Sequence, residues 1–341
     1  TAYEISLGLV GSEMCIRDRL KARFEGGEGP ELLEPGRKVF DVEFPLWSKE
    51  KLDELKESKV VERLCEVSGV HYVAHTWTPL KLIALAYWVG VYTMIIPRHF
   101  NTFWYLDLLA GPGTDLIKET GDVIVGSPFI AHFLARRPFS RYVFVELDEE
   151  RYRALRERAK ALSLPASIYH GDCNVIVRGL GLNADHMLVF ADCEGLDVRW
   201  ATIDKLLNRP SDLLLLFQTK ELNRTLGRAR QGLGDEKKLE LFMGDSTWRQ
   251  AEDADELLEL YMIKLLQYRD YVSNIKIRGR FEYDLILACK QGPYVKAWEE
   301  LKWRLEAVTD EDAELALRML KGEVKALDEF FSRQRKLSEF I

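Results

Sequence analysis

The stretch Asp107-Leu108-Leu109-Ala110-Gly111-Pro112-Gly113 decides the fold of this chain. It follows a short apolar run, Phe103–Leu106, and its glycines let the backbone pass close to a ligand. A tight turn, a dinucleotide site and a nucleoside site all begin this way. A dinucleotide site needs a third glycine that opens directly into a helix, but Leu116 and a long loop follow here. The stretch therefore favours a nucleoside cofactor without a pyrophosphate.

Downstream of this stretch, short apolar runs alternate with helical stretches, which begin at Ser127-Pro128 and at Asp148. Runs as continuous as Leu213–Phe217 suit strands that are buried on both faces of a parallel sheet. The pattern predicts an α/β, doubly wound (Rossmann-like), mostly parallel sheet in the order 3-2-1-4-5, followed by an antiparallel hairpin. The predicted strands are Phe103–Leu106, Tyr142–Val145, Ser167–Tyr169, Met187–Ala191 and Leu213–Phe217, and the hairpin comprises Val272–Arg278 and Glu282–Cys289.

The first residues do not read as native protein. Met14-Cys15-Ile16-Arg17-Asp18-Arg19 back-translates to the end of a transposase-type sequencing adapter, and Thr1–Ile5 back-translates to a flow-cell primer in the same frame. We therefore expect residues 1–19 to be translated adapter sequence. The remaining chain divides into an N-terminal arm and helices (20–100), the sheet domain (101–290) and a C-terminal helical extension (291–341).

Composition narrows the class of protein. The chain has 341 residues and a formal net charge of −7, which argues against a protein that coats a polyanion. Its cysteines form neither a CxxC pair nor a metal-ligand spacing, so we expect no metal and a reducing, cytoplasmic location. The longest apolar run, Leu82–Pro97, is shorter than the roughly 20 residues of a bilayer span. We interpret it as a buried helix and expect no membrane partner.

Acidic residues close the first four predicted strands, at the sheet edge where ligands bind in such folds. Glu146 ends the second strand, where its carboxylate can accept from two ribose hydroxyls. Asp172 follows the third strand and is either an acceptor for an adenine amino group or a helix cap. Asp192 follows the fourth strand. These positions predict S-adenosylmethionine (SAM), with a cofactor site that comprises Asp107, Ala110, Gly111, Gly113, Glu146, Asp172 and Asp192.

With these residues assembled, the chain resembles the three-Cys-motif partner protein (TcmP) family across most of residues 78–250. The motifs that carry the resemblance are Lys81-Leu82-Ile83, Asp107–Gly113, Gly126-Ser127-Pro128, Glu146-Leu147-Asp148, Gly171-Asp172-Cys173-Asn174, Gly195–Trp200 and Gly244…Trp248. The resemblance implies a class I methyltransferase sheet and a partner protein that carries a three-cysteine motif. In one place the chain departs from the family, because Asp192-Cys193-Glu194-Gly195 stands where the family has Asp-Pro-aromatic-Gly.

The leading functional hypothesis is SAM-dependent methyl transfer, with Asp192 as the polar or basic group at the transfer point and Glu194 as the second choice. For the acceptor, Lys220 and Arg224 lie in the insertion after the fifth strand. They either contact nucleic-acid phosphates or form a solvated helix face. Trp248 either covers the acceptor or is a core residue.

The alternative hypothesis is a non-catalytic, SAM-binding accessory partner of a three-Cys-motif protein, and a dehydrogenase comes third. The arginines at 151, 153, 156 and 158 alternate with glutamates, which predicts ordinary surface ion pairs. Cys173 and Cys193 follow strands that lie roughly 14 Å apart in the predicted order, too far for a disulfide.

Overall fold

The computed structural model describes residues 51, 54–55, 58–278, 282–308, 313, 316–318 and 320–321, and all of them belong to one compact unit, Phe44–Ile341. The expected adapter sequence (1–19), most of the N-terminal arm and most of the last predicted helix lie outside the described residues. The domain boundaries drawn from the sequence therefore stay predictions.

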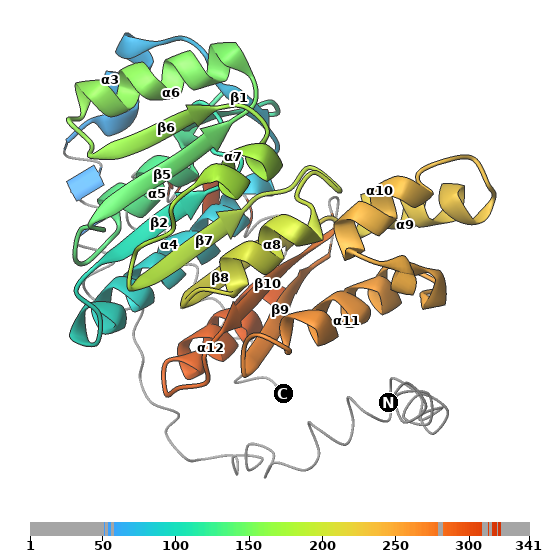
Figure 1. Ribbon diagram of the computed structural model, residues 1–341. Coiled ribbons are helices and arrows are strands. Elements are labelled where there is room, and N and C mark those ends of the chain that lie inside the picture. Colours follow the sequence, from blue (N-terminus) through green and yellow to red (C-terminus); the bar gives the residue numbers. More distant parts are fainter. Residues whose placement is uncertain are drawn as a thin grey trace, which may run out of the picture. The chain divides into compact units, whose positions relative to one another are not determined.

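A seven-stranded sheet in the order β6-β5-β2-β7-β8-β10-β9 forms the centre of the unit (Figure 1). The first five strands pair in parallel in the predicted order 3-2-1-4-5, and β10 pairs antiparallel with both β8 and β9. The predicted α/β, doubly wound fold with its hairpin is confirmed. The strands are β2 (Phe103–Asp107), β5 (Arg141–Glu146), β6 (Ala166–His170), β7 (His186–Ala191), β8 (Ser211–Phe217), β9 (Tyr271–Ile277) and β10 (Tyr283–Cys289).

Every residue of β2, β7 and β8 is buried, because helices cover both faces of the sheet. Alternate residues such as Tyr105, Phe190 and Leu214 share one core cluster with the residues of α4 and α12. The helices are α3 (Val60–Val67), α4 (Thr78–Ile95), α5 (Ser127–Phe133), α6 (Glu149–Ala161), α7 (Cys173–Gly179), α8 (Trp200–Leu207), α9 (Thr219–Arg230), α10 (Glu236–Met243), α11 (Ala254–Leu265) and α12 (Val295–Glu306).

Helix α4 is the predicted apolar helix. It is long and apolar enough to cross a membrane by composition alone, but 78% of its most apolar window is buried inside the protein. Trp88 of α4 packs edge-on against Trp298 of α12, with ring centroids 5.7 Å apart. These contacts identify α4 as a core helix, as expected.

The sequence did not reveal a small second sheet. Strands β1 (Tyr72–Ala74), β3 (Thr114–Ile117) and β4 (Val123–Val125) form a three-stranded sheet in the order β1-β3-β4. Two of its strands lie in the segment that we expected to be a long loop before Ser127. The polar insertion after β8 is likewise ordered and forms α9, α10 and the 3₁₀ helix Ser246–Gln250 (η2).

Candidate functional site

A cavity of about 960 Å³ lies at the carboxyl ends of the parallel strands. The chain leaves β2 toward β5 on one side and returns to β7 on the other, so this is the switch point where doubly wound sheets bind ligands. The lining comes from the glycine loop, the ends of β5 to β8, the small sheet and helices α9 and α10. It comprises Tyr72, Lys81, Leu82, Leu108–Gly111, Asp115, Ser127, Glu146–Glu149, Arg151, His170–Asn174, Asp192, Glu194–Asp197, Arg199, Gln218, Glu221, Thr225, Lys238 and Leu241.

Gly111 and Gly113, the two glycines predicted to contact the cofactor, have different structural roles. Gly111 lines the cavity at φ +60°, with no atom within 4 Å of the position that a Cβ would take. Gly113, at φ +84°, lies behind the loop, where a Cβ would come within 2.3 Å of the Phe129 ring. Gly113 is therefore required for packing, whereas Gly111 and Ala110 line the cavity.

Asp107 was predicted to contact the cofactor, but it is fully buried and absent from the cavity lining. Its carboxylate accepts a hydrogen bond from the hydroxyl of Tyr105 at 3.1 Å and one from the backbone N–H of Leu109 at 3.4 Å. Burial raises the pKa of Asp107 to about 7, against the lowering effect of hydrogen bonds from Ser127 and Tyr105. Asp107 thus stabilises the glycine loop through its hydrogen bond with the N–H of Leu109.

Glu146 lies on the cavity wall, as predicted. Its Oε2 accepts from the N–H of Gly111 and its Oε1 from the N–H of Asp148, both at 2.8 Å. The carboxylate is fixed by backbone donors on two loops, and each oxygen keeps a further acceptor position. Leu147 beside it is 64% exposed, and its carbonyl accepts from the ring of His170 at 3.0 Å when that nitrogen carries the proton.

Asp172 caps α7, which confirms one of its two predicted roles, and it also lines the cavity, so its role as an adenine acceptor stays a prediction. Its Oδ1 accepts from the backbone N–H and the side-chain amide of Asn174, at 2.7 and 2.8 Å. Asp148 caps α6 in the same way, through the N–H of Arg151. Both caps hold strand-end loops against the cavity.

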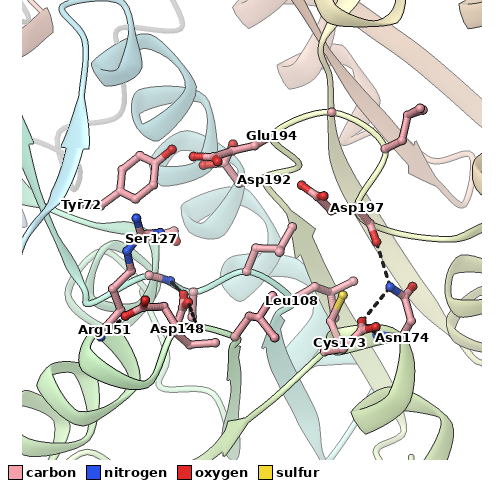
Figure 2. Close-up of a pocket in the computed structure, with 18 of the residues that line it drawn as sticks. Tyr72, Leu108, Ser127, Asp148, Arg151, Cys173, Asn174, Asp192, Glu194 and Asp197 are labelled. Carbon is pink, nitrogen blue, oxygen red and sulfur yellow. Dashed lines mark hydrogen bonds between the residues drawn. The ribbon is translucent and has the colours of Figure 1, made fainter. Parts of the chain in front are cut away.

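Asn174, which the sequence singled out only through the family resemblance, connects two of these loops. Its amide donates to the carbonyl of Asp197 at 2.8 Å, as Figure 2 shows. Its own carbonyl oxygen accepts from the N–H of Arg199 at 2.8 Å and from the hydroxyl of Thr202 at 2.7 Å. Asn174 is buried, so these bonds fix the loop after β7 relative to α7.

At the switch point itself, Lys81 of α4 forms an ion pair with Asp192 at the end of β7. Asp115 of the small sheet lies close enough for both charges to act on it. Burial raises the pKa of Asp115 to about 7, while Lys81 lowers it and Asp192 raises it. Neither Lys81 nor Asp115 was predicted as a site residue, because neither follows a strand of the main sheet.

Glu194, the second predicted catalytic residue, also lines the cavity. Burial and the charge of Asp197 raise the pKa of its carboxyl. In Figure 2, Glu194 and Asp192 lie close together and face the hydroxyl end of Tyr72, whereas Asp197 lies across the cavity. The loop Asp192–Gly195 thus presents two carboxylates, those of Asp192 and Glu194, to the cavity.

None of the predicted acceptor residues lines the cavity. Lys220 is exposed on α9, and Arg224 pairs with Glu221 at 2.6 Å. Trp248 belongs to η2 and is buried, with 2% of its surface exposed. The Arg249 guanidinium lies 4.4 Å from its ring centroid. The structure therefore favours the readings of a solvated helix face and a core tryptophan.

The described cysteines are all free thiols, and Cys173 and Cys193 are both buried. Among the described residues there is no group of three or more histidine, cysteine or acidic side chains that could hold a metal ion.

No protein-family model and no curated protein matches the sequence. Protein LPL1258 from Legionella pneumophila is 14% identical, with 67% of this chain and 90% of that chain covered and a TM-score of 0.43. The plantazolicin methyltransferase BpumL in complex with S-adenosylhomocysteine (SAH) is 12% identical, with 72% and 96% covered and a TM-score of 0.36. Precorrin-6y C5,15-methyltransferase from Geobacter metallireducens is 14% identical, with 60% and 87% covered and a TM-score of 0.32. At these scores the likeness identifies no family for the chain.

Proposed function

We propose that the cavity binds SAM and that the chain is a SAM-dependent methyltransferase. The observation that carries the proposal is the Glu146 carboxylate, held on the cavity wall by the N–H groups of Gly111 and Asp148. A carboxylate fixed in this way suits the paired hydroxyls of a ribose. The open backbone at Gly111 suits the close approach of a nucleoside.

The rest of the cavity fits the same ligand. We assign the adenine to the space between the exposed side chain of Leu147 and Asp172, whose Oδ2 lies 3.9 Å from the Arg199 guanidinium and keeps an acceptor position for an amino group. Ala110 and Gly111 would pass beside the ribose. The sulfonium end would then lie toward Asp192, and a cation there is favoured by the acidic side chains of that wall.

When bound, SAM supplies an activated methyl group. The task of the chain is then to align an acceptor nucleophile and to take its proton. Lys81 holds Asp192 at the switch point, so the Asp192 carboxylate can orient the acceptor. Asp107 and Asn174 touch neither ligand in this scheme, and they position the loops that do.

Calorimetry tests the cofactor. Glu146→Ala should lower the affinity for SAM and for SAH by about 100-fold, since it removes a charged acceptor and also frees the glycine loop. Glu150→Ala, at an exposed position on α6 outside the cavity lining, should leave both affinities unchanged. Equal affinities for Glu146→Ala and wild-type protein would remove the basis of the proposal.

We further propose membership of the TcmP family, with a three-Cys-motif protein as partner. Several of the residues that carry the resemblance line the cavity, among them Lys81, Leu147 and Asp197. One observation favours the accessory alternative, because the Asp192 carboxylate is already engaged by Lys81. Co-purification with a three-Cys-motif protein, combined with transfer of labelled methyl groups from SAM to cell extract, separates a catalytic partner from an accessory one.

A further inference from the structure

The cavity lining is strongly acidic. It holds nine aspartate or glutamate side chains against four lysines and arginines. One of those four, Lys238, pairs at 2.8 Å with Asp235, which lies outside the lining. A cleft with this balance attracts cations and repels the phosphates of nucleic acid.

The acidic residues whose charge the fold does not satisfy lie on one wall of the cavity, which we define by Asp115, Asp192 and Glu194. Glu146, Asp148 and Asp172 each accept hydrogen bonds from backbone N–H groups, so their charges are partly satisfied by the fold. Among the described residues, Lys81 is the one cation that pairs with Asp192, and the same ammonium acts on Asp115. This wall therefore carries uncompensated negative charge toward the cavity.

Asp115 is more buried than Asp192 and Glu194. It is 9% exposed and lines the cavity, and it accepts no side-chain hydrogen bond from any residue in the described part of the chain. Its oxygens are not among the fully buried atoms without a partner, so the carboxylate opens to the cavity, where its partial burial makes the charged form costly. A ligand that brings N–H donors and a positive charge would remove that cost.

An aromatic ring stands beside Asp115. Tyr72 and Asp115 are direct partners across strands β1 and β3, so their side chains leave the small sheet next to each other and both line the cavity. Figure 2 shows the hydroxyl end of Tyr72 pointing toward Asp192 and Glu194. The Arg151 guanidinium already lies 4.9 Å from the ring centroid, so this ring is a surface that accepts cations.

We propose that the methyl acceptor is a primary aliphatic amine, which enters as its ammonium ion and binds between Tyr72, Asp115 and Glu194. This inference rests on the proposed methyltransferase function and names its substrate class. Carboxylates and an aromatic ring are the groups that recognise an ammonium ion, whereas a nucleic acid would bring its phosphates against this wall.

The chemical step balances without any further reactant. The ammonium ion gives one proton to the Asp115 carboxylate, which frees the nitrogen lone pair. A nitrogen–carbon bond to the methyl group forms as the carbon–sulfur bond breaks, and the electron pair of that bond stays on sulfur as a neutral thioether. The product is a protonated secondary amine, and Asp115 returns its proton to water. Burial raises the pKa of Asp115 to about 7, which suits a group that accepts and releases a proton near neutral pH.

The test uses full-length protein, methyl-labelled SAM and matched acceptors: butylamine, 1-butanol, butyrate and a single-stranded oligoribonucleotide. Label should reach butylamine and none of the others. Asp115→Asn should lower kcat/KM for butylamine by about 100-fold. Glu194→Gln should raise its KM by about tenfold. Glu259→Gln, the same change at an exposed position on α11, should alter neither value.

Binding of SAH, measured in parallel, separates the two proposals. If the wild-type protein binds SAH but labels the oligoribonucleotide, 1-butanol or butyrate, or labels nothing, the amine inference is wrong and the cofactor proposal stands. If it binds neither SAM nor SAH, the proposed function itself fails. A further outcome that overturns the inference is a loss of SAH affinity in Asp115→Asn as large as the loss of methylation, because Asp115 would then hold the cofactor.

Discussion

The ammonium group of Lys81 forms an ion pair with Oδ2 of Asp192, across a sequence separation of 111 residues. The two side chains are only 11% and 20% exposed, so water screens the pair weakly. The pair connects α4, the long buried helix, with the end of β7 at the switch point. It is the one direct link between the N-terminal helices and the predicted transfer point that we identify in the described residues.

Lys81→Met should therefore reduce methyl transfer more than it reduces the stability of the fold. The change leaves Asp192 without its counter-ion in a wall that already contains Asp115. We expect a loss of about 1–3 kcal/mol in the free energy of unfolding, below the value for a fully buried pair because both groups retain some solvent. Methyl transfer should fall by at least tenfold. Lys81→Arg keeps the charge and should retain most of the stability, as urea unfolding would show; equal losses for both variants would argue against the ion pair.

Asp107 should make the protein less stable as the pH rises. Its pKa is raised by burial from an ordinary 3.8 to about 7, so the folded state holds a proton that the unfolded chain releases. The contribution is complete below about pH 4 and is lost as the pH rises toward about 7. The slope approaches about 1.4 kcal/mol per pH unit for one proton. Urea unfolding of the wild type and Asp107→Asn at several pH values should show the difference shrinking as the pH rises.

Asp185 provides a control, because its contribution to stability should change with pH in the direction opposite to that of Asp107. Its carboxylate accepts from the N–H groups of Asn101 at 3.1 Å and Thr102 at 2.8 Å, and the hydrogen bonds from Thr102 lower its pKa. A lowered pKa stabilises the fold above the ordinary pKa of the group and loses that contribution as the pH falls. The difference between wild type and Asp185→Asn should therefore grow with pH. Parallel curves for Asp107→Asn and wild type would show that Asp107 is ionised throughout.

The sequence was sufficient for the main sheet because both signals that specify it are local. Apolar runs mark buried strands, and an acidic residue near each carboxyl end marks the ligand edge, so Glu146, Asp172 and Asp192 could be placed before the structure was known. Asp115 and Lys81 could not be placed in this way. Strand β3 has four residues and β1 has three, and such short strands carry little periodicity. Their pairing joins segments that are far apart in the chain.

One charged residue that the sequence pattern placed on the surface is buried in the structure. Arg158 stands in an alternating series of arginines and glutamates and was predicted to form an ordinary surface ion pair, yet its side chain is 0% exposed. The prediction was wrong because α3 packs against α6 and covers that position. Arg153, by contrast, does pair with Glu149 on the surface, as the spacing indicated.

Alanine at Gly111 and at Gly113 of the glycine loop should separate an effect on binding from an effect on folding. In Gly113→Ala the new Cβ would come within 2.3 Å of Phe129 at φ +84°. Strain and overpacking together should cost about 2–4 kcal/mol in the free energy of unfolding. In Gly111→Ala, at φ +60° with open space, the cost should be about 1 kcal/mol, but the methyl group would project where a nucleoside must approach. Urea unfolding and SAH calorimetry on both variants check this; similar stabilities would contradict the contact with Phe129.

Arg158 should be the most sensitive single position of the fold outside the apolar core. Its guanidinium donates to four backbone carbonyls, those of Leu64 at 3.0 Å, Ser68 at 2.5 Å, Val70 at 2.8 Å and Pro112 at 2.9 Å. Three of these oxygens belong to the end of α3 and the segment before β1, and the fourth belongs to the glycine loop. One side chain thus fixes the glycine loop to the elements that carry Tyr72.

Arg158→Met fills similar space but leaves the carbonyls of Ser68, Val70 and Pro112 without this donor in a buried setting, while the Leu64 carbonyl keeps the N–H of Ser68. At about 1–3 kcal/mol for an unsatisfied buried group, partly offset by removal of a buried charge, we expect a net loss of about 3–5 kcal/mol. Arg158→Lys keeps the charge but cannot reach four acceptors in one plane, so its loss should be intermediate. Because Pro112 is released, SAH affinity should fall in both variants even at temperatures where they remain folded. Unfolding by urea together with calorimetry tests this, and a Met variant as stable as wild type would mean that water replaces the guanidinium.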